Sequence, residues 1–192
     1  SDVPSSQPSD VPTAITPTDT PAAPSEFPNP LSVGVFEPGG IAFGAGVYED
    51  NMFYTTLLFG GVRVANVRTG KLFVLVPNML FLQRLMYGAA YHGFTASLLV
   101  AGTEKVNGTD EGRIFVFDVT TGVTLASCGK PDLYPTDITI VGGTAYASNS
   151  AQNNVFSLDI TSAVLGECVT ATLPLPADLV SGKVDPSVIL GK

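Results

Sequence analysis

Three copies of one pattern fill residues 40–175, and each consists of short apolar segments separated by Gly, Asn or Asp. The copies align on an acid or amide that ends a segment, at Asn66, Asp118 and Asp159. Segments of this length, rich in β-branched and aromatic residues and bounded by turn residues, predict strands. Each copy supplies four of them, at 40–43, 51–57, 62–67 and 72–76; at 88–91, 98–101, 113–119 and 124–127; and at 137–141, 145–148, 155–160 and 168–172.

A repeat of roughly 40–50 residues built from strands alone is typical of a β-propeller blade. We therefore predict an all-β fold with about three four-stranded blades and the start of a fourth. Propellers close with typically 4–8 blades, so three blades are interpreted as about half of a six-bladed ring. A truncated gene product and a homodimer of two such chains both fit this interpretation. The predicted blades cover about 36–78, 86–131 and 134–176, and the fourth begins at 177–192.

The repeated acid or amide has a structural explanation. Asn66 is followed by Val-Arg-Thr-Gly and Asp118 by Val-Thr-Thr-Gly. Asn and Asp side chains bond to nearby backbone groups in turns, and a following Gly accepts positive φ. We therefore predict that Asn66, Asp118 and Asp159 are turn residues.

Residues 1–30 differ from the rest of the chain, because they contain eight Pro, four acidic residues and neither Lys nor Arg. Pro removes backbone donors, and the polar residues between cannot bury enough surface to offset chain entropy. This composition predicts a disordered Pro/Ser/Thr-rich linker ahead of a partial propeller domain over 31–192.

The composition also limits the classes of partner and of activity that we expect. The formal net charge of −8 disfavours contact with phosphate backbones, so we expect no nucleic-acid partner. No apolar run reaches the roughly 18–20 residues that a membrane span needs. His92 is the one histidine and no Gly-x-Ser-x-Gly motif accompanies it, so no catalytic residue is assigned.

Three further residues bear on the cellular location of the protein. Cys128 and Cys168 follow Asp118 and Asp159 at similar spacing, in the outer strands of adjacent copies. They either form a disulfide or lie too far apart, since outer strands of neighbouring blades splay. Asn107-Gly108-Thr109 is an N-glycosylation sequence within 104–111, an insertion predicted to be an exposed loop. These features and the linker predict an extracellular or cell-surface protein.

A second insertion covers residues 78–87 and is apolar and mixed in pattern. A loop helix that covers a blade edge and an interface contact are both open interpretations of this segment.

Three strings resemble the superfamily of senescence marker protein, gluconolactonase and calcium-dependent phosphotriesterase. They are Glu37-Pro38-Gly39-Gly40-Ile41-Ala42-Phe43, Gly112-Arg113-Ile114-Phe115-Val116-Phe117-Asp118 and Tyr134-Pro135-Thr136-Asp137-Ile138-Thr139-Ile140. The resemblance covers residues 36–176 loosely. It implies a six-bladed propeller with a divalent metal in its channel that hydrolyses lactones or phosphotriesters.

The resemblance implies Glu37 and Asp137 as metal ligands, with calcium as the metal. Gly39 stands where the family places its first acid, and Thr136 stands where it places an Asn ligand. Calcium takes six to eight oxygen ligands, so these changes predict a degenerate site. The leading hypothesis is a secreted or surface binding module for a small molecule, a polysaccharide or a protein. The alternative is a metal-dependent lactone or ester hydrolase that is active as a full-length or dimeric ring.

Overall fold

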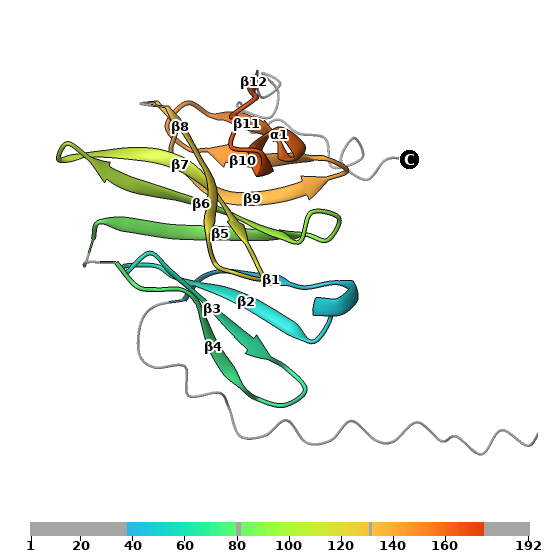
Figure 1. Cartoon of the computed structure of the whole chain (residues 1–192). Coiled ribbons are helices and arrows are strands. Elements are labelled where there is room, and N and C mark those ends of the chain that lie inside the picture. Colours follow the sequence, from blue (N-terminus) through green and yellow to red (C-terminus); the bar gives the residue numbers. More distant parts are fainter. Residues whose placement is uncertain (1–37, 80–81, 131, 175–192) are drawn as a thin grey trace, which may run out of the picture. The chain divides into compact units, whose positions relative to one another are not determined.

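The computed structural model describes residues 38–79, 82–130 and 132–174. It consists mainly of three four-stranded antiparallel sheets, in each of which the strands follow chain order (Figure 1). This architecture confirms the predicted blades, and we number them from the N-terminus. The predicted linker over 1–30 and the predicted fourth blade at 177–192 lie outside the described residues. Blade 1 contains β1 (Pro38–Phe43), β2 (Asn51–Thr56), β3 (Gly61–Asn66) and β4 (Leu72–Val76); blade 2 contains β5 (Arg84–His92), β6 (Ser97–Val106), β7 (Thr109–Asp118) and β8 (Thr124–Lys130); blade 3 contains β9 (Pro135–Val141), β10 (Thr144–Asn149), β11 (Asn154–Asp159) and β12 (Thr170–Pro174).

The repeated acid or amide acts as predicted in two blades and differently in the third. The Thr69 N–H donates to Asn66 Oδ1 at 2.8 Å, and the Thr121 N–H donates to Asp118 Oδ1 at 2.9 Å. In blade 3, Asp159 instead caps a short helix, α1 (Ile160–Val164), by accepting from the Ser162 N–H at 2.7 Å. A Ser, Thr, Asn or Asp ahead of a helical first turn satisfies a donor that the helix leaves unpaired.

The insertion at 104–111 is a regular hairpin rather than the loop that we predicted. β6 and β7 pair without interruption from Ser97↔Asp118 to Val106↔Thr109. The two residues between them, Asn107 and Gly108, have φ of 53° and 84°. An Asn-Gly pair at positive φ forms the two-residue turn whose twist suits a hairpin. The extra length therefore continues the sheet.

The insertion at 78–87 ends in a strand, because β5 already begins at Arg84. Met86 is fully buried in the apolar cluster between blades 1 and 2. A loop helix over residues 84–87 is therefore wrong: burial of Met86 and pairing with β6 favour the extended conformation.

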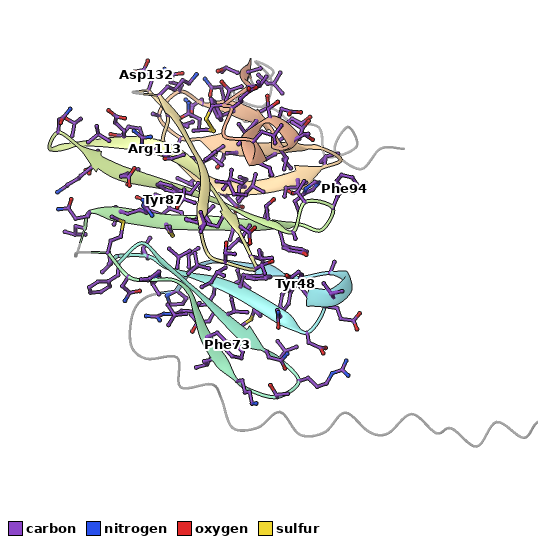
Figure 2. The ribbon with its side chains drawn as sticks, viewed as in Figure 1. Tyr48, Phe73, Tyr87, Phe94, Arg113 and Asp132 are labelled. Atoms are coloured by element: carbon purple, nitrogen blue, oxygen red, sulfur yellow. A yellow bond between two sulfur atoms is a disulfide. The ribbon has the colours of Figure 1, made fainter. Side chains whose placement is uncertain are left out.

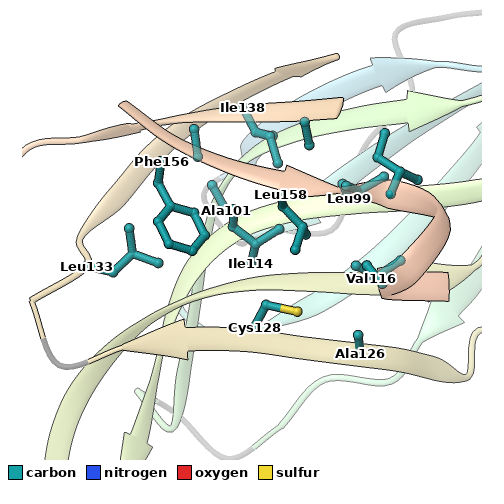
Figure 3. Close-up of a cluster of buried hydrophobic side chains, with 14 residues drawn as sticks. Leu99, Ala101, Ile114, Val116, Ala126, Cys128, Leu133, Ile138, Phe156 and Leu158 are labelled. Atoms are coloured by element: carbon teal, nitrogen blue, oxygen red, sulfur yellow. The ribbon is translucent and has the colours of Figure 1, made fainter. Parts of the chain in front are cut away.

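Blade 2 is buried on both faces, which explains the unbroken apolar run of β7. Side chains alternate across a strand. Phe115 and Phe117 accordingly join the cluster shared with blade 1, whereas Ile114 and Val116 join the cluster shared with blade 3. Figure 3 shows the second cluster, where Phe156 and Leu158 of blade 3 meet blade 2.

A disulfide joins the outer parts of blades 2 and 3. Cys128 lies in β8, and Cys168 lies between α1 and β12, with their Cα atoms 5.4 Å apart. Helix α1 contacts β8 and buries Ile160 and Ala163 in the same cluster as Cys128. The helix therefore carries the chain back over blade 2. This path explains how Cys168 reaches Cys128 although outer strands splay.

Two sheet faces have no further sheet against them among the described residues. The outer face of blade 1 exposes Ile41 and Phe43 by 52% and 64%. The outer face of blade 3 is more polar and contains Thr139, Tyr146 and Ser148. In the described part of the chain, no helix is long and apolar enough to cross a membrane.

Candidate functional site

Each of the three inner strands is irregular at the same level. The pairing register shifts between Pro38 and Ile41 in β1, between Met86 and Ala89 in β5, and in β9 opposite Ala147 to Asn149. A β-bulge leaves an extra residue outside the ladder and redirects its side chain, and bulges are frequent next to binding sites. Inner strand β5 contacts both β1 and β9, so the three irregular segments are neighbours.

These three segments line one open pocket of about 300 Å³. Its wall consists of two residues from each irregular segment and one residue that follows β2. The lining residues are Gly39, Gly40, Leu57, Tyr87, Gly88, Thr136 and Asp137. The pocket is therefore a product of the repeat, because each blade contributes the same part of its inner strand.

Thr55 holds two of the irregular segments together. Its side chain is fully buried, and its Oγ1 accepts from the Gly40 N–H at 2.7 Å. The hydroxyl in turn donates to the carbonyls of Met86 and Tyr87 at 3.2 and 3.3 Å. A buried backbone group without a partner costs free energy, and a bulge breaks ladder bonds. Thr55 therefore replaces bonds that β1 and β5 lose at their bulges.

Ser148 has the same role in blade 3. Its Oγ accepts from the Asp137 N–H at 3.1 Å and lies 2.8 Å from Thr136 Oγ1. A hydroxyl on the second strand therefore supports the bulge of the inner strand in both cases. These contacts fix the backbone on which Thr136 and Asp137 are presented.

Glycine allows the inner strands to approach one another. A Cβ on Gly40 would collide with the backbone of Gly88 and Ala89, and a Cβ on Gly88 would collide with Asp137. Close approach of two backbones is a common reason for glycine in a strand. The narrow spacing places the Asp137 carboxylate beside Gly88, in the wall of the pocket.

Asp137 is the one charged residue among the seven that line the pocket. Its side chain is exposed, and its Oδ1 accepts from the Ile138 N–H at 2.9 Å. One carboxylate oxygen thus anchors the side chain to the strand. The carboxylate can also accept hydrogen bonds from a ligand.

The residues described do not by themselves form a calcium site. Glu37, the other predicted ligand, lies outside the described residues. Among the residues described, no three of the types His, Cys, Asp and Glu come together in a way that could hold a metal ion. The side chains of the lining residues include one carboxylate, one threonine hydroxyl and one tyrosine hydroxyl, whereas calcium takes six to eight oxygens.

The other predicted site residues lie away from the pocket. Asn107 is exposed at the tip of the β6–β7 hairpin, and Cys128 and Cys168 form the disulfide between the outer parts of two blades. His92 ends β5, where its Nδ1 lies 2.7 Å from Thr95 Oγ1. The structure therefore brings Asp137 alone, of the described site residues, to the pocket.

Sequence reasoning missed Tyr87 as a pocket residue, because we assigned it to an insertion rather than to an inner strand. Tyr87 lies on β5 (Figure 2). It lines the pocket together with Gly88. The pair Tyr87-Gly88 occupies the same place in blade 2 as Gly39-Gly40 in blade 1. The recurrence of glycine just before an apolar inner strand was the signal that could have found it.

Comparison with protein-family models gives no match, and comparison with curated proteins also gives none. Solved structures do match. A chain of the nidogen–laminin complex is 16% identical with a TM-score of 0.56, over 74% of this chain and 49% of that chain. A chain of the mitotic checkpoint complex is 14% identical with a TM-score of 0.53, over 88% and 47%. Hydrazine synthase of Kuenenia stuttgartiensis is 18% identical with a TM-score of 0.52, over 72% and 37%.

These likenesses define the class of fold. Three blades with strands in chain order, together with these neighbours, show that the described part of the chain has a β-propeller fold. The chain spans about half or less of each of these three chains. Similarity at this identity shows the fold alone, and function has to be argued from the site.

Proposed function

We propose that this chain is a propeller-type binding module whose pocket binds a hydroxyl-rich ligand, namely a neutral polysaccharide. The observation that carries the proposal is the convergence of three bulged inner strands on one pocket. Bulges weaken a sheet locally, so a fold that repeats one in every blade, at one level, gains something other than stability. Ligand binding is the function that this arrangement serves best.

The lining residues match the chemistry of a sugar. The Asp137 carboxylate accepts hydrogen bonds from hydroxyl groups, and the Thr136 hydroxyl both donates and accepts. Tyr87 also lines the pocket, and a tyrosine side chain can offer a flat apolar surface to C–H groups together with a phenolic hydroxyl. A few placed polar groups in a mostly apolar pocket are typical of small-ligand sites.

Charge selects among polysaccharides. The pocket has one carboxylate and no cationic lining residue, and the chain has a formal net charge of −8. Like charges repel an anionic ligand as it approaches and within the pocket. The proposal therefore assigns a neutral polysaccharide rather than a sulfated or uronic-acid polymer.

We place this module outside the cell or at its surface. A disulfide is stable in an oxidising compartment and rare in the cytosol. The sequence of residues 1–30 suits a flexible tether, and a protein of similar fold takes part in the nidogen–laminin complex. These observations support a displayed recognition module, for which a protein ligand is the competing outcome.

The test is a polysaccharide microarray probed with the full chain and with single variants. We expect the wild type to bind neutral polysaccharides and not sulfated ones. Asp137→Asn and Tyr87→Ala should each weaken binding about tenfold or more, because each removes a principal contact. Asp132→Asn is the matched control, since Asp132 is exposed and outside the pocket (Figure 2). Equal binding by Asp137→Asn and Asp132→Asn would overturn the proposal.

One observation favours the hydrolase alternative. Asp137, which the family resemblance implies as a metal ligand, does lie in the pocket between the inner strands. The described residues lack the remaining oxygens, so this alternative requires them from a second copy or from a longer chain. Calcium-dependent lactone turnover, together with a calcium-dependent doubling of mass in light scattering, would favour it. A calcium-independent mass without turnover would exclude it for this chain.

A further inference from the structure

We propose that Asn107 is an N-glycosylation site and that its glycan extends from the tip of the β6–β7 hairpin. Asn107-Gly108-Thr109 is the one Asn-x-Ser/Thr sequence of the 192 residues, and its middle residue is not proline. The structure places all three residues where the blade ends. This inference is independent of the ligand proposed for the pocket.

The turn presents the asparagine side chain to solvent. Asn107, Gly108 and Thr109 are all exposed, and no described residue forms a side-chain hydrogen bond with Asn107. A Cβ placed on Gly108 would meet no atom within 4 Å. The space around the tip therefore accommodates a bulky substituent without any change of the fold.

A chain of ion pairs braces the hairpin below this tip. Arg84 Nη2 lies 2.6 Å from Glu104 Oε1, and Arg113 joins Glu104 and Glu111 at 3.4 and 2.8 Å. Their side chains are 13–27% exposed, and the Arg84 guanidinium also lies 4.5 Å above the Phe115 ring. Half-buried networks of this kind restrain geometry more than single surface pairs do. The ion pairs thus restrain the hairpin that carries the acceptor asparagine.

A glycan at this position would shield the edges of the hairpin. Its last two pairs, Lys105↔Asp110 and Val106↔Thr109, extend beyond the ends of β5 and β8 in the pairing. The Lys105 N–H still donates to the Gln83 carbonyl, and the Asp110 carbonyl accepts from the Tyr134 hydroxyl, so the edges of this extension are only partly open to another strand. Charged residues already cover these edges, and a glycan at the tip would shield them further.

The glycan would not block the pocket. The bulge of β5 lies opposite Ala101, six residues before Asn107 along β6. A strand rises about 3.3 Å per residue, so the tip is roughly 20 Å beyond the pocket level. Modification and ligand binding are therefore compatible on one molecule.

The disulfide supplies the independent support. A disulfide such as Cys128–Cys168 is typical of proteins from an oxidising compartment, and N-glycosylation of an Asn-x-Thr sequence belongs to secreted proteins. The reaction needs a lipid-linked oligosaccharide diphosphate as co-substrate. Asn107 Nδ2 attacks the anomeric carbon and forms the N–C bond, the anomeric C–O bond breaks, the lipid diphosphate leaves, and Nδ2 loses one proton.

The experiment expresses the full chain through a eukaryotic secretory pathway and measures its mass before and after peptide-N-glycosidase F. We expect the enzyme to lower the mass and to convert Asn107 to Asp. Thr109→Ala should abolish the change while it leaves the Asn107-Gly108 turn intact, and Thr109→Ser should retain it. Asn153→Gln is the matched control, because Asn153 is also exposed, has φ of 48° and is not followed by x-Ser/Thr.

Each result of this experiment either supports or overturns the assignment of the glycan to Asn107. Loss of the glycan in Thr109→Ala, with retention in Thr109→Ser and Asn153→Gln, supports the assignment to Asn107. Secretion of a disulfide-bonded but unmodified wild-type chain would overturn it. A glycan that persists in Thr109→Ala would also overturn it, because the sugar would then be attached elsewhere.

Discussion

The interface between blades 1 and 2 and the interface between blades 2 and 3 join equivalent sheets by different means. The first contains aromatic pairs that cross from one blade to the other, such as Phe53 stacked on Tyr91 at 5.5 Å. The second contains mainly aliphatic side chains and the Cys128–Cys168 disulfide. Aromatic stacking and a covalent link therefore serve the same architectural purpose in neighbouring positions.

The two interfaces show that a repeat can diverge in its contact residues without a change of fold. A blade needs a complementary apolar face on its neighbour, and many side-chain sets provide one. The interfaces should consequently fail under different treatments. Substitution of a ring should affect the first, and reduction should affect the second.

The largest expected effect follows removal of the interfacial ring in Phe53→Ala. Phe53 is 1% exposed, and truncation of a buried Phe costs about 3–5 kcal/mol of unfolding free energy. Urea unfolding should show this loss, and hydrogen exchange should localise it to blades 1 and 2. Phe73→Ala is the control, because Phe73 is 54% exposed and should cost far less. Equal losses for both variants would contradict the stacking account.

A smaller effect should follow removal of the disulfide in Cys128→Ala/Cys168→Ala. The link spans 40 residues of sequence, and a native disulfide of this kind stabilises by about 2–4 kcal/mol. We expect hydrogen exchange to accelerate in β9 to β12 while β1 to β4 keep their protection. Reduction of the wild type provides a second measurement of the same bond. A uniform loss over all three blades would show that the disulfide is not specific to one interface.

The smallest expected effect is the loss of stability in acid. It should differ between the blades, because blade 1 has an Asn at the repeated position and blades 2 and 3 have an Asp. The N–H groups of Thr121 and Thr120 hold the pKa of Asp118 below its ordinary 3.8, and the Ser162 N–H lowers the pKa of Asp159 likewise. A lowered folded pKa contributes stability above the unfolded value that is lost as pH falls below 3.8. Asn66 does not titrate in blade 1. Acid should therefore weaken blades 2 and 3 first.

Acid titration of variants checks this contrast. Asp118→Asn/Asp159→Asn should keep the turn bonds and lower the acid midpoint of unfolding. Asn66→Asp should introduce acid sensitivity into blade 1. An acid midpoint that does not move in either variant would show that these carboxylates contribute nothing to the pH dependence.

The blades could be predicted from the sequence because strand and turn signals are local. Apolar segments bounded by Asn66 or Asp118 and a later glycine fix a strand and its turn. Asn107-Gly108 carried an equally local hairpin signal, which we assigned to a loop because the repeat comparison treated the extra residues as an insertion. The local turn signal therefore predicted the β6–β7 hairpin correctly, whereas the alignment of the three copies did not.

The pocket could not be predicted in the same way. A bulge depends on the register between two strands, and the sequence of one strand does not determine it. Tyr87 becomes a lining residue through the shift between Met86 and Ala89. The disulfide likewise depends on α1, whose packing on β8 is a tertiary effect. Asp137 was found through the family resemblance. The resemblance identified this residue but not the residues that line the pocket around it.

The most direct test of the binding proposal locates the ligand by backbone hydrogen exchange, with a soluble neutral β-glucan oligosaccharide as the probe. The account predicts that the oligosaccharide protects amides at Tyr87–Gly88 and at Thr136–Asp137, and that the protection disappears in Asp137→Asn. Protection confined to the β6–β7 tip or to the outer face of blade 3, with those amides unchanged, would contradict it.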